Sequence, residues 1–80
     1  MPSPISKEDK VALIKLGERV KSIRNEKGLS LEDVAKEIGK DRQSIHKLEK
    51  GDFNPSYIYL LQICKGLEIE LSDLLVNFTL

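Results

Sequence analysis

Residues 29–51 read LSLEDVAKEIGKDRQSIHKLEKG and contain two short helical patterns with one glycine between them. Ser30 is a good N-cap for the first pattern, and Gly39 ends it. Asp41 is a good N-cap for the second pattern, which Gly51 ends. Helices joined by so short a turn cannot lie side by side as a relaxed hairpin. They are expected to cross steeply and to leave one face of the second helix exposed.

The rest of the chain also has apolar residues at three- and four-residue steps, and it lacks the alternation typical of strands. We therefore predict an all-α protein whose domain spans residues 7–76, between a flexible N-terminus at 1–6 and a C-terminal tail at 77–80. The capping residues and glycines predict helices over residues 7–27, 31–38, 42–50, 57–67 and 71–76.

Each helical pattern has an apolar side that should face the core. For residues 57–67, the expected buried set is Leu60, Leu61, Ile63, Cys64 and Leu67. The solvated side of residues 7–27 should carry Lys7, Lys10, Lys15, Lys21 and Lys27. Tyr57 and Tyr59 are expected at the edge of the core or at a phosphate backbone, rather than stacked on bases.

The charges are unevenly distributed, although the net charge of the 80 residues is zero. Residues 1–51 hold twelve basic and nine acidic side chains, whereas residues 52–80 hold one and four. A basic first part and an acidic second part fit a protein with one anion-binding surface.

Several classes of function are disfavoured by what the sequence lacks. A single cysteine, Cys64, and a single histidine, His46, cannot form an internal disulfide or a Cys/His metal site, so we expect no metal and no cofactor. The scattered carboxylates and the lack of a glycine-rich phosphate loop argue against an enzyme. Without an apolar run of about 18 residues or an apolar signal core, the expected location is cytoplasmic, with no membrane contact.

The expected helix 42–50 has a polar face without any acidic residue. At about 100° per residue, this face covers an arc of about 140°, with Ile45 and Leu48 opposite. Arg and Lys can donate to guanine and Gln can pair with adenine in the DNA major groove, which admits one α-helix. We predict base contacts from Arg42, Gln43, His46 and Lys47. Phosphate contacts, which position a protein without specifying sequence, are expected from Ser30, Lys40, Lys50 and Asn54.

Residues 29–51 resemble the helix-turn-helix of the Cro/phage-repressor class, often called the XRE family. The resemblance covers about residues 16–75 and implies a five-helix, lambda-repressor-like DNA-binding domain. Such a domain docks its third helix in the major groove, usually as a symmetric dimer. The matching elements are Leu29-Ser30, Ala35, Gly39, Ser44-Ile45 and Leu48-Glu49-Lys50-Gly51.

The resemblance also has two structural implications. It implies an internal ion pair between Arg24, late in the first helix, and Glu49, at the end of the third. Glycine commonly follows the fourth helix of the family at the position of Glu68, whereas Gly66 here lies inside the predicted helix. We therefore expect an irregular last turn in that helix.

The function predicted from these features is a sequence-specific DNA-binding transcriptional regulator that binds double-stranded DNA as a homodimer. Two alternatives keep the same fold. One is an antitoxin that binds a toxin protein and regulates its own operon. The other is a protein–protein adaptor, but an adaptor has no reason to exclude acidic residues from the face of helix 42–50.

Overall fold

The computed structural model describes residues 5–76 of the chain and shows five α-helices and no strand in that part. The helices are α1 (Lys7–Glu26), α2 (Leu31–Ile38), α3 (Arg42–Glu49), α4 (Tyr57–Leu67) and α5 (Leu71–Leu75). The all-α prediction is confirmed, and α1, α3 and α5 each end one residue before the predicted end. The predicted tail 77–80 and the first four residues of the predicted N-terminus 1–6 lie outside the described residues. None of the helices in this part has the length and apolar character needed to cross a bilayer.

Side chains at the helix starts explain where the first four helices begin. Ser6, Ser30, Asp41 and Ser56 each accept a hydrogen bond from the backbone N–H three residues later. Each bond satisfies one of the amides that a helix start leaves without a partner. At α2 the Asp33 carboxylate also accepts from the Ser30 N–H, which completes a capping box.

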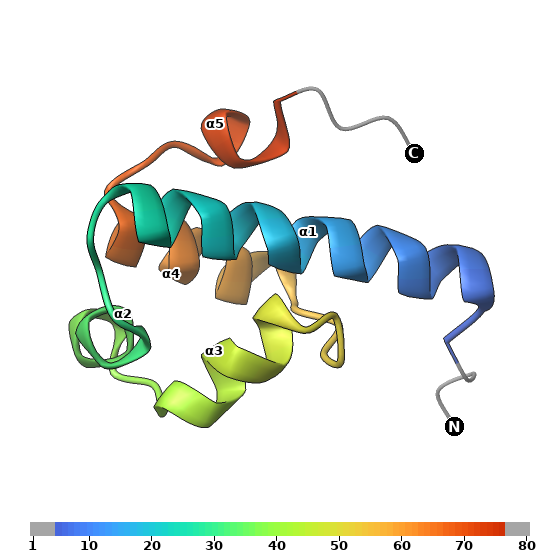
Figure 1. Ribbon diagram of the computed structural model, residues 1–80, viewed down its shortest axis with the longest axis horizontal. Coiled ribbons are helices and arrows are strands. Elements are labelled where there is room, and N and C mark those ends of the chain that lie inside the picture. The colour runs from blue at the N-terminus through green and yellow to red at the C-terminus, as the bar shows by residue number, and fades with distance from the viewer. Residues whose placement is uncertain (1–4, 77–80) are drawn as a thin grey trace.

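The long helix α1 crosses the molecule, with the shorter helices arranged around it (Figure 1). In that view α5 lies above α1, α2 and α3 lie below it, and α4 lies behind. The helices pack in pairs: α1 against α3 and α5, α4 against α2 and α5, and α2 against α3. Because both α1 and α2 contact α3, the inner side of α3 is held on the core while its outer side is left uncovered.

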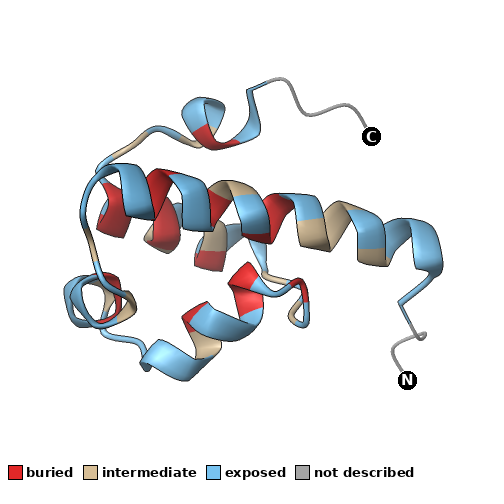
Figure 2. Cartoon of the chain, in the orientation of Figure 1, coloured by how far each residue is buried: buried red, intermediate tan, exposed pale blue. Residues whose placement is uncertain are grey.

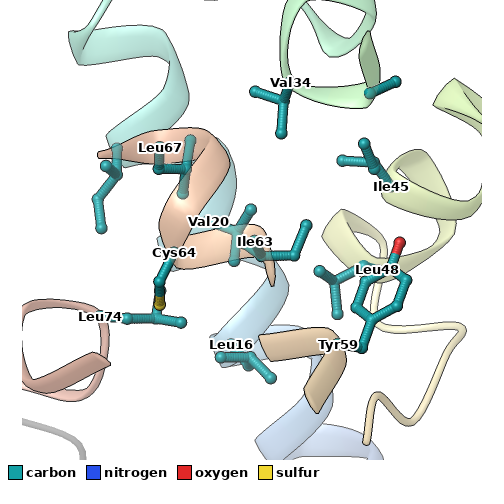
Figure 3. Packing of buried hydrophobic residues seen from close by; sticks show 12 residues of the cluster. Leu16, Val20, Val34, Ile45, Leu48, Tyr59, Ile63, Cys64, Leu67 and Leu74 are labelled. Carbon is teal, nitrogen blue, oxygen red and sulfur yellow. The ribbon is translucent and has the colours of Figure 1, made fainter. Parts of the chain in front are cut away.

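The core is mainly aliphatic and draws on all five helices (Figures 2 and 3). Its most enclosed side chains include Ile45 and Leu48 of α3, Ile63 and Leu67 of α4, and Leu74 of α5, all at 0% exposure. Each such side chain stabilises the fold by about 1.5–3 kcal/mol relative to an exposed position. The two from α3 therefore fix which side of that helix faces inward.

The predicted inner side of α4 is right for Ile63, Cys64 and Leu67 and wrong for Leu61, which is 37% exposed. Leu61 lies two residues before Ile63, which is about 200° around the helix axis. The sequence YIYLLQICKGL is apolar on nearly every side, so its periodicity did not identify the inner face.

The irregular last turn expected in α4 is not found, because the chain stays helical through Leu67. Glu68 then adopts a left-handed conformation, with φ 58° and ψ 45°, which glycine would adopt more easily. Gly66 serves the packing of α4 on α2, because a Cβ atom there would lie 2.8 Å from the side chain of Ile38.

Candidate nucleic-acid interface

Three residues join α2 to α3 and set the angle between the two helices. Gly39 adopts the left-handed conformation, with φ 68° and ψ 32°, which a residue with a Cβ atom would adopt at a cost. The Lys40 N–H donates to the Ala35 carbonyl at 3.0 Å and closes the end of α2. Asp41 then starts α3 by accepting from the Ser44 N–H at 2.8 Å. The chain therefore changes direction within one turn, as the sequence predicts.

The outer side of α3 consists of polar side chains, and Figure 2 shows it largely exposed. On the inner side, Ile45 and Leu48 are fully buried. None of the side chains predicted to contact bases is buried under another part of residues 5–76. The exposed set is Arg42, Gln43, His46, Lys47 and Lys50.

Glu49, the acidic residue within α3, is buried and paired with Arg24 of α1. Its Oε2 accepts from Arg24 Nε at 2.7 Å, and its Oε1 accepts from Arg24 Nη2 at 3.0 Å. The side chains of Glu49 and Arg24 are only 2% and 10% exposed. Arg24 Nη1 also donates to the Leu29 carbonyl at 2.8 Å, and the hydrogen bond to Glu49 raises the pKa of Arg24. The negative charge of Glu49 is therefore neutralised inside the protein and kept off the outer face of α3.

Two glycines let α1 approach the C-terminal end of α3 closely, and sequence reasoning missed both as site-positioning residues. A Cβ atom on Gly17 would lie 2.4 Å from the carbonyl oxygens of Leu48 and Glu49. A Cβ atom on Gly51, which has a φ of 77°, would lie 2.7 Å from the side chain of Ile14. The available signal was Gly17 itself, because a glycine inside a helix is destabilising and usually has a packing reason.

The N-terminal end of α3 is held by Tyr59 of α4. The Tyr59 hydroxyl lies 2.9 Å from the Ser44 hydroxyl, which itself donates to the Asp41 carbonyl at 3.1 Å, so Tyr59 is the donor. The Tyr59 ring meets Phe53 edge-on at 4.9 Å, and the Lys40 ammonium lies 5.8 Å from its centre. Burial raises the pKa of Tyr59. Tyr59 is expected from the sequence at the edge of the core or at a phosphate backbone, and the structure places it at the edge of the core.

The four side chains predicted to contact phosphate are exposed at helix ends and in loops: Ser30, Lys40, Lys50 and Asn54. Their surroundings differ in charge. Beside Ser30, the first turn of α2 carries Glu32 and Asp33, and the Ser30 N–H lowers the pKa of the Asp33 carboxyl by hydrogen bonding to it. The first turns of α3 and α4 carry no acidic residue. The Asp41 carboxylate caps α3, so the start of α4 is better placed than the starts of α2 and α3 to face an anion.

Known proteins share this fold. The helix-turn-helix family HTH_3 matches residues 20–74. YgzD, an uncharacterized HTH-type transcriptional regulator of Bacillus subtilis, is 36% identical over 55 residues, which cover 69% of this chain and 83% of the relative. The restriction-modification controller protein C.AhdI from Aeromonas hydrophila superposes with a TM-score of 0.77 at 36% identity, over 80% of this chain and 97% of that one. The clp gene regulator ClgR from C. glutamicum superposes with a TM-score of 0.75 at 27% identity, over 79% and 82%.

The match to the family includes all of α2, α3 and α4, and thus the whole exposed face described above. It begins at Val20, so the first thirteen residues of α1 lie outside it. On this evidence the chain belongs to the HTH_3 helix-turn-helix family, which is of the Cro/phage-repressor type that its sequence resembles.

Proposed function

We propose that this protein is a sequence-specific DNA-binding transcriptional regulator that places α3 in the major groove. Membership of the helix-turn-helix family and the names of the relatives support a DNA-binding regulator. The single observation that supports the role of α3 is its exposed face, which consists of cationic and amide side chains. Glu49, the acidic residue of α3, is not part of this face because it is buried in an ion pair. Such a face complements the acceptor atoms and the negative potential of the groove.

In this proposal the first turns of α3 contact base edges. Arg42 and Lys47 donate to guanine, Gln43 pairs with adenine, and His46 donates to a base acceptor. These four side chains extend from a helix whose other side is fully buried, so the core keeps them in register with the bases. The phosphate contacts come from Ser30, Lys40, Lys50 and Asn54 and hold the helix in the groove.

We also propose that the protein binds as a homodimer, so that two α3 helices contact half-sites about one helical turn, or 34 Å, apart. Exposed apolar side chains on α4 and α5 support this, because a second copy of the chain could bury them and remove their apolar surface from water. Tyr57 and Ile58 are 63% and 61% exposed on α4, and Leu75 and Val76 are 41% and 50% exposed at the end of α5. Leu61 lies one turn beyond Tyr57 on the same side of α4.

Selection of bound sequences from a random pool of double-stranded DNA tests the proposal. We expect a two-fold symmetric consensus, because each half-site meets one copy of α3. Affinity for the selected site should fall as salt rises, with a log–log slope of about −0.9 for each phosphate that the protein neutralises. A pool without enrichment after repeated rounds, together with salt-independent binding, would contradict the assignment.

The remaining predictions from the sequence have no separate support in residues 5–76. A toxin partner, the adaptor role and the absence of catalysis stay predictions. A cytoplasmic location accompanies the proposed function, because a transcriptional regulator works where the DNA is.

A further inference from the structure

Three charged side chains meet at the C-terminal end of α3, and one of them comes from the start of α1. The Lys10 Nζ lies 2.6 Å from Asp52 Oδ1, and the Lys50 Nζ lies 3.5 Å from Asp52 Oδ2. Lys10 also donates to the Gly51 carbonyl. Lys10 is partly solvated, as predicted, but the prediction did not include this contact with the loop. Its side chain is 38% exposed and reaches across to the loop that follows α3.

The backbone keeps the Asp52 carboxylate in this place. The Asp52 N–H donates to the Lys47 carbonyl at 2.9 Å, and the preceding Gly51 packs against Ile14 of α1. The carboxylate therefore stays close to Lys50, which is one of the residues proposed to contact phosphate. There it competes with phosphate for the Lys50 ammonium, and any part of its charge that is not neutralised repels the DNA backbone.

The two lysines do not share Asp52 equally. The Lys10 distance is shorter by 0.9 Å, since the two separations are 2.6 Å and 3.5 Å. The hydrogen bond from Lys10 is also the largest cause of the lowered pKa of the Asp52 carboxyl. Asp52 is thus bound mainly by Lys10, and Lys50 is bound only loosely.

We propose that Lys10 is a positioning residue for the DNA interface, which holds the Asp52 carboxylate so that Lys50 can exchange Asp52 for a DNA phosphate. This inference rests on the proposed function and deepens it. With Lys10 present, the cluster of Lys10, Lys50 and Asp52 has a net charge of +1. Without Lys10 the cluster is neutral, and Lys50 has a carboxylate as its nearest partner. Lys10 lies outside the residues 20–74 that match the family, so the family match assigns it no role.

The chain offers a matched control for the charge of Lys10. Lys7 lies one turn earlier on α1 and is exposed, and none of the ion pairs found among the described residues involves it. Replacing either lysine by methionine removes one positive charge and keeps a long side chain. A difference between the two variants therefore reports the contact with Asp52 and not the net charge.

A titration without DNA tests the cluster itself. The pKa of the Asp52 carboxyl is followed by NMR in the full chain, in K10M and in K50M. We expect K10M to raise this pKa, and K50M to raise it less. The proposal is overturned if K50M raises the pKa of Asp52 as much as K10M does, because Asp52 would then interact equally strongly with both lysines.

DNA binding tests the consequence, with the site selected as described above. We expect K10M to weaken binding about fivefold, the upper range for an exposed ion pair. We expect it to reduce the salt slope by about 0.9 per protomer, because Lys50 no longer reaches a phosphate. The double variant K10M/D52N should regain both the affinity and the slope, since it removes the competing carboxylate. K7M should change affinity less than twofold, and K10R should bind like the wild type.

The double variant separates the proposal from simpler roles of Lys10. If Lys10 contacted phosphate itself, or only braced the loop, D52N would regain some affinity by removing a negative charge but would not restore the salt slope of K10M. An unrestored slope in K10M/D52N would therefore overturn the proposal. A loss in K7M equal to that in K10M would overturn it as well. Thermal melts of all variants confirm that each is folded. If the wild type shows no salt-dependent DNA binding, the proposed function fails, whereas the titration still reports on the cluster.

Discussion

The two ends of α3 are built in opposite ways. At the C-terminal end, α1 approaches backbone to backbone at Gly17, and Arg24 binds the buried carboxylate of Glu49 through two hydrogen bonds. At the N-terminal end, Arg42 and Gln43 are exposed. There the helix is tied to the rest of the fold by the hydrogen bond between Ser44 and Tyr59.

The fold thus separates the contacts that position α3 from the side chains that recognise DNA. A helix that recognises DNA needs a fixed orientation, which packing and a buried ion pair supply at its C-terminal end. It also needs side chains that water and DNA can reach, which only an uncovered surface supplies. Substitutions at the two ends should therefore affect different properties. Those at the buried contacts of the C-terminal end should lower stability, and those on the exposed face should lower affinity or specificity.

Glu49→Ala should have the largest effect on stability. It leaves the Arg24 guanidinium buried beside an empty space, and we expect the free energy of unfolding to fall by about 3 kcal/mol. Urea denaturation measures the change. The control is E37A on the exposed side of α2, which should change stability by less than about 0.5 kcal/mol. A loss in E49A no larger than in E37A would mean that the ion pair does not anchor α3.

Gly17→Ala should have the next largest effect on stability. The sign of the change in the free energy of unfolding decides between two opposing effects. Alanine favours a helix over glycine by about 1 kcal/mol. Against this, the new methyl group would meet the carbonyl oxygens of Leu48 and Glu49, and overpacking of this kind destabilises by about 1–3 kcal/mol or more. Because backbone atoms cannot rotate away, we expect a net loss of about 2 kcal/mol. S22A, at an exposed site on the same helix, is the control, and a more stable G17A would show that α1 and α3 do not touch here.

The features that could be predicted from the sequence are local ones. The N-caps at Ser30 and Asp41, and the glycine that ends α2, act within four residues, so the helix bounds follow from short-range chemistry. The outward direction of Arg42 and Gln43 follows from helical periodicity together with the burial of Ile45. The pairing of Arg24 with Glu49 follows only from the resemblance to a family, because 25 residues separate the two side chains.

The features that could not be predicted depend on how distant helices meet. Lys10 and Asp52 are 42 residues apart, and nothing near Lys10 in the sequence distinguishes it from the exposed lysines of α1. The sequence does not show that Leu61 faces outward, because α4 is apolar on nearly every side. The packing of α4 against α2 and α5 decides which side is its inner face. Gly17 carried a signal of close packing, but its partner on α3 could not be read from the sequence.

Tyr59→Phe should have a smaller effect, confined to the N-terminal end of α3. It removes the hydroxyl that donates to Ser44, and the loss of one hydrogen bond lowers the free energy of unfolding by about 1 kcal/mol. Amide exchange should become faster in the first turn of α3 and stay unchanged near Leu48. Y57F is the control, because Tyr57 is 63% exposed and its hydroxyl makes none of the hydrogen bonds found within residues 5–76, so its removal should not change exchange in α3. Equal protection of the first turn in Y59F and wild type would mean that this hydrogen bond does not hold the helix end.

Gln43→Ala should change stability least, by less than about 0.5 kcal/mol, because the side chain is exposed on the outer face. Its effect should appear in binding, where the preference for one base pair in each half-site relaxes by about 1–3 kcal/mol. The comparison variant is K50A, which should weaken binding to all sequences alike, because a phosphate contact carries no sequence information. Repeating the selection from random DNA with both variants separates these outcomes. If Q43A unfolded as readily as E49A while keeping its base preference, the exposed end of α3 would be a structural element, and the division between its two ends would fail.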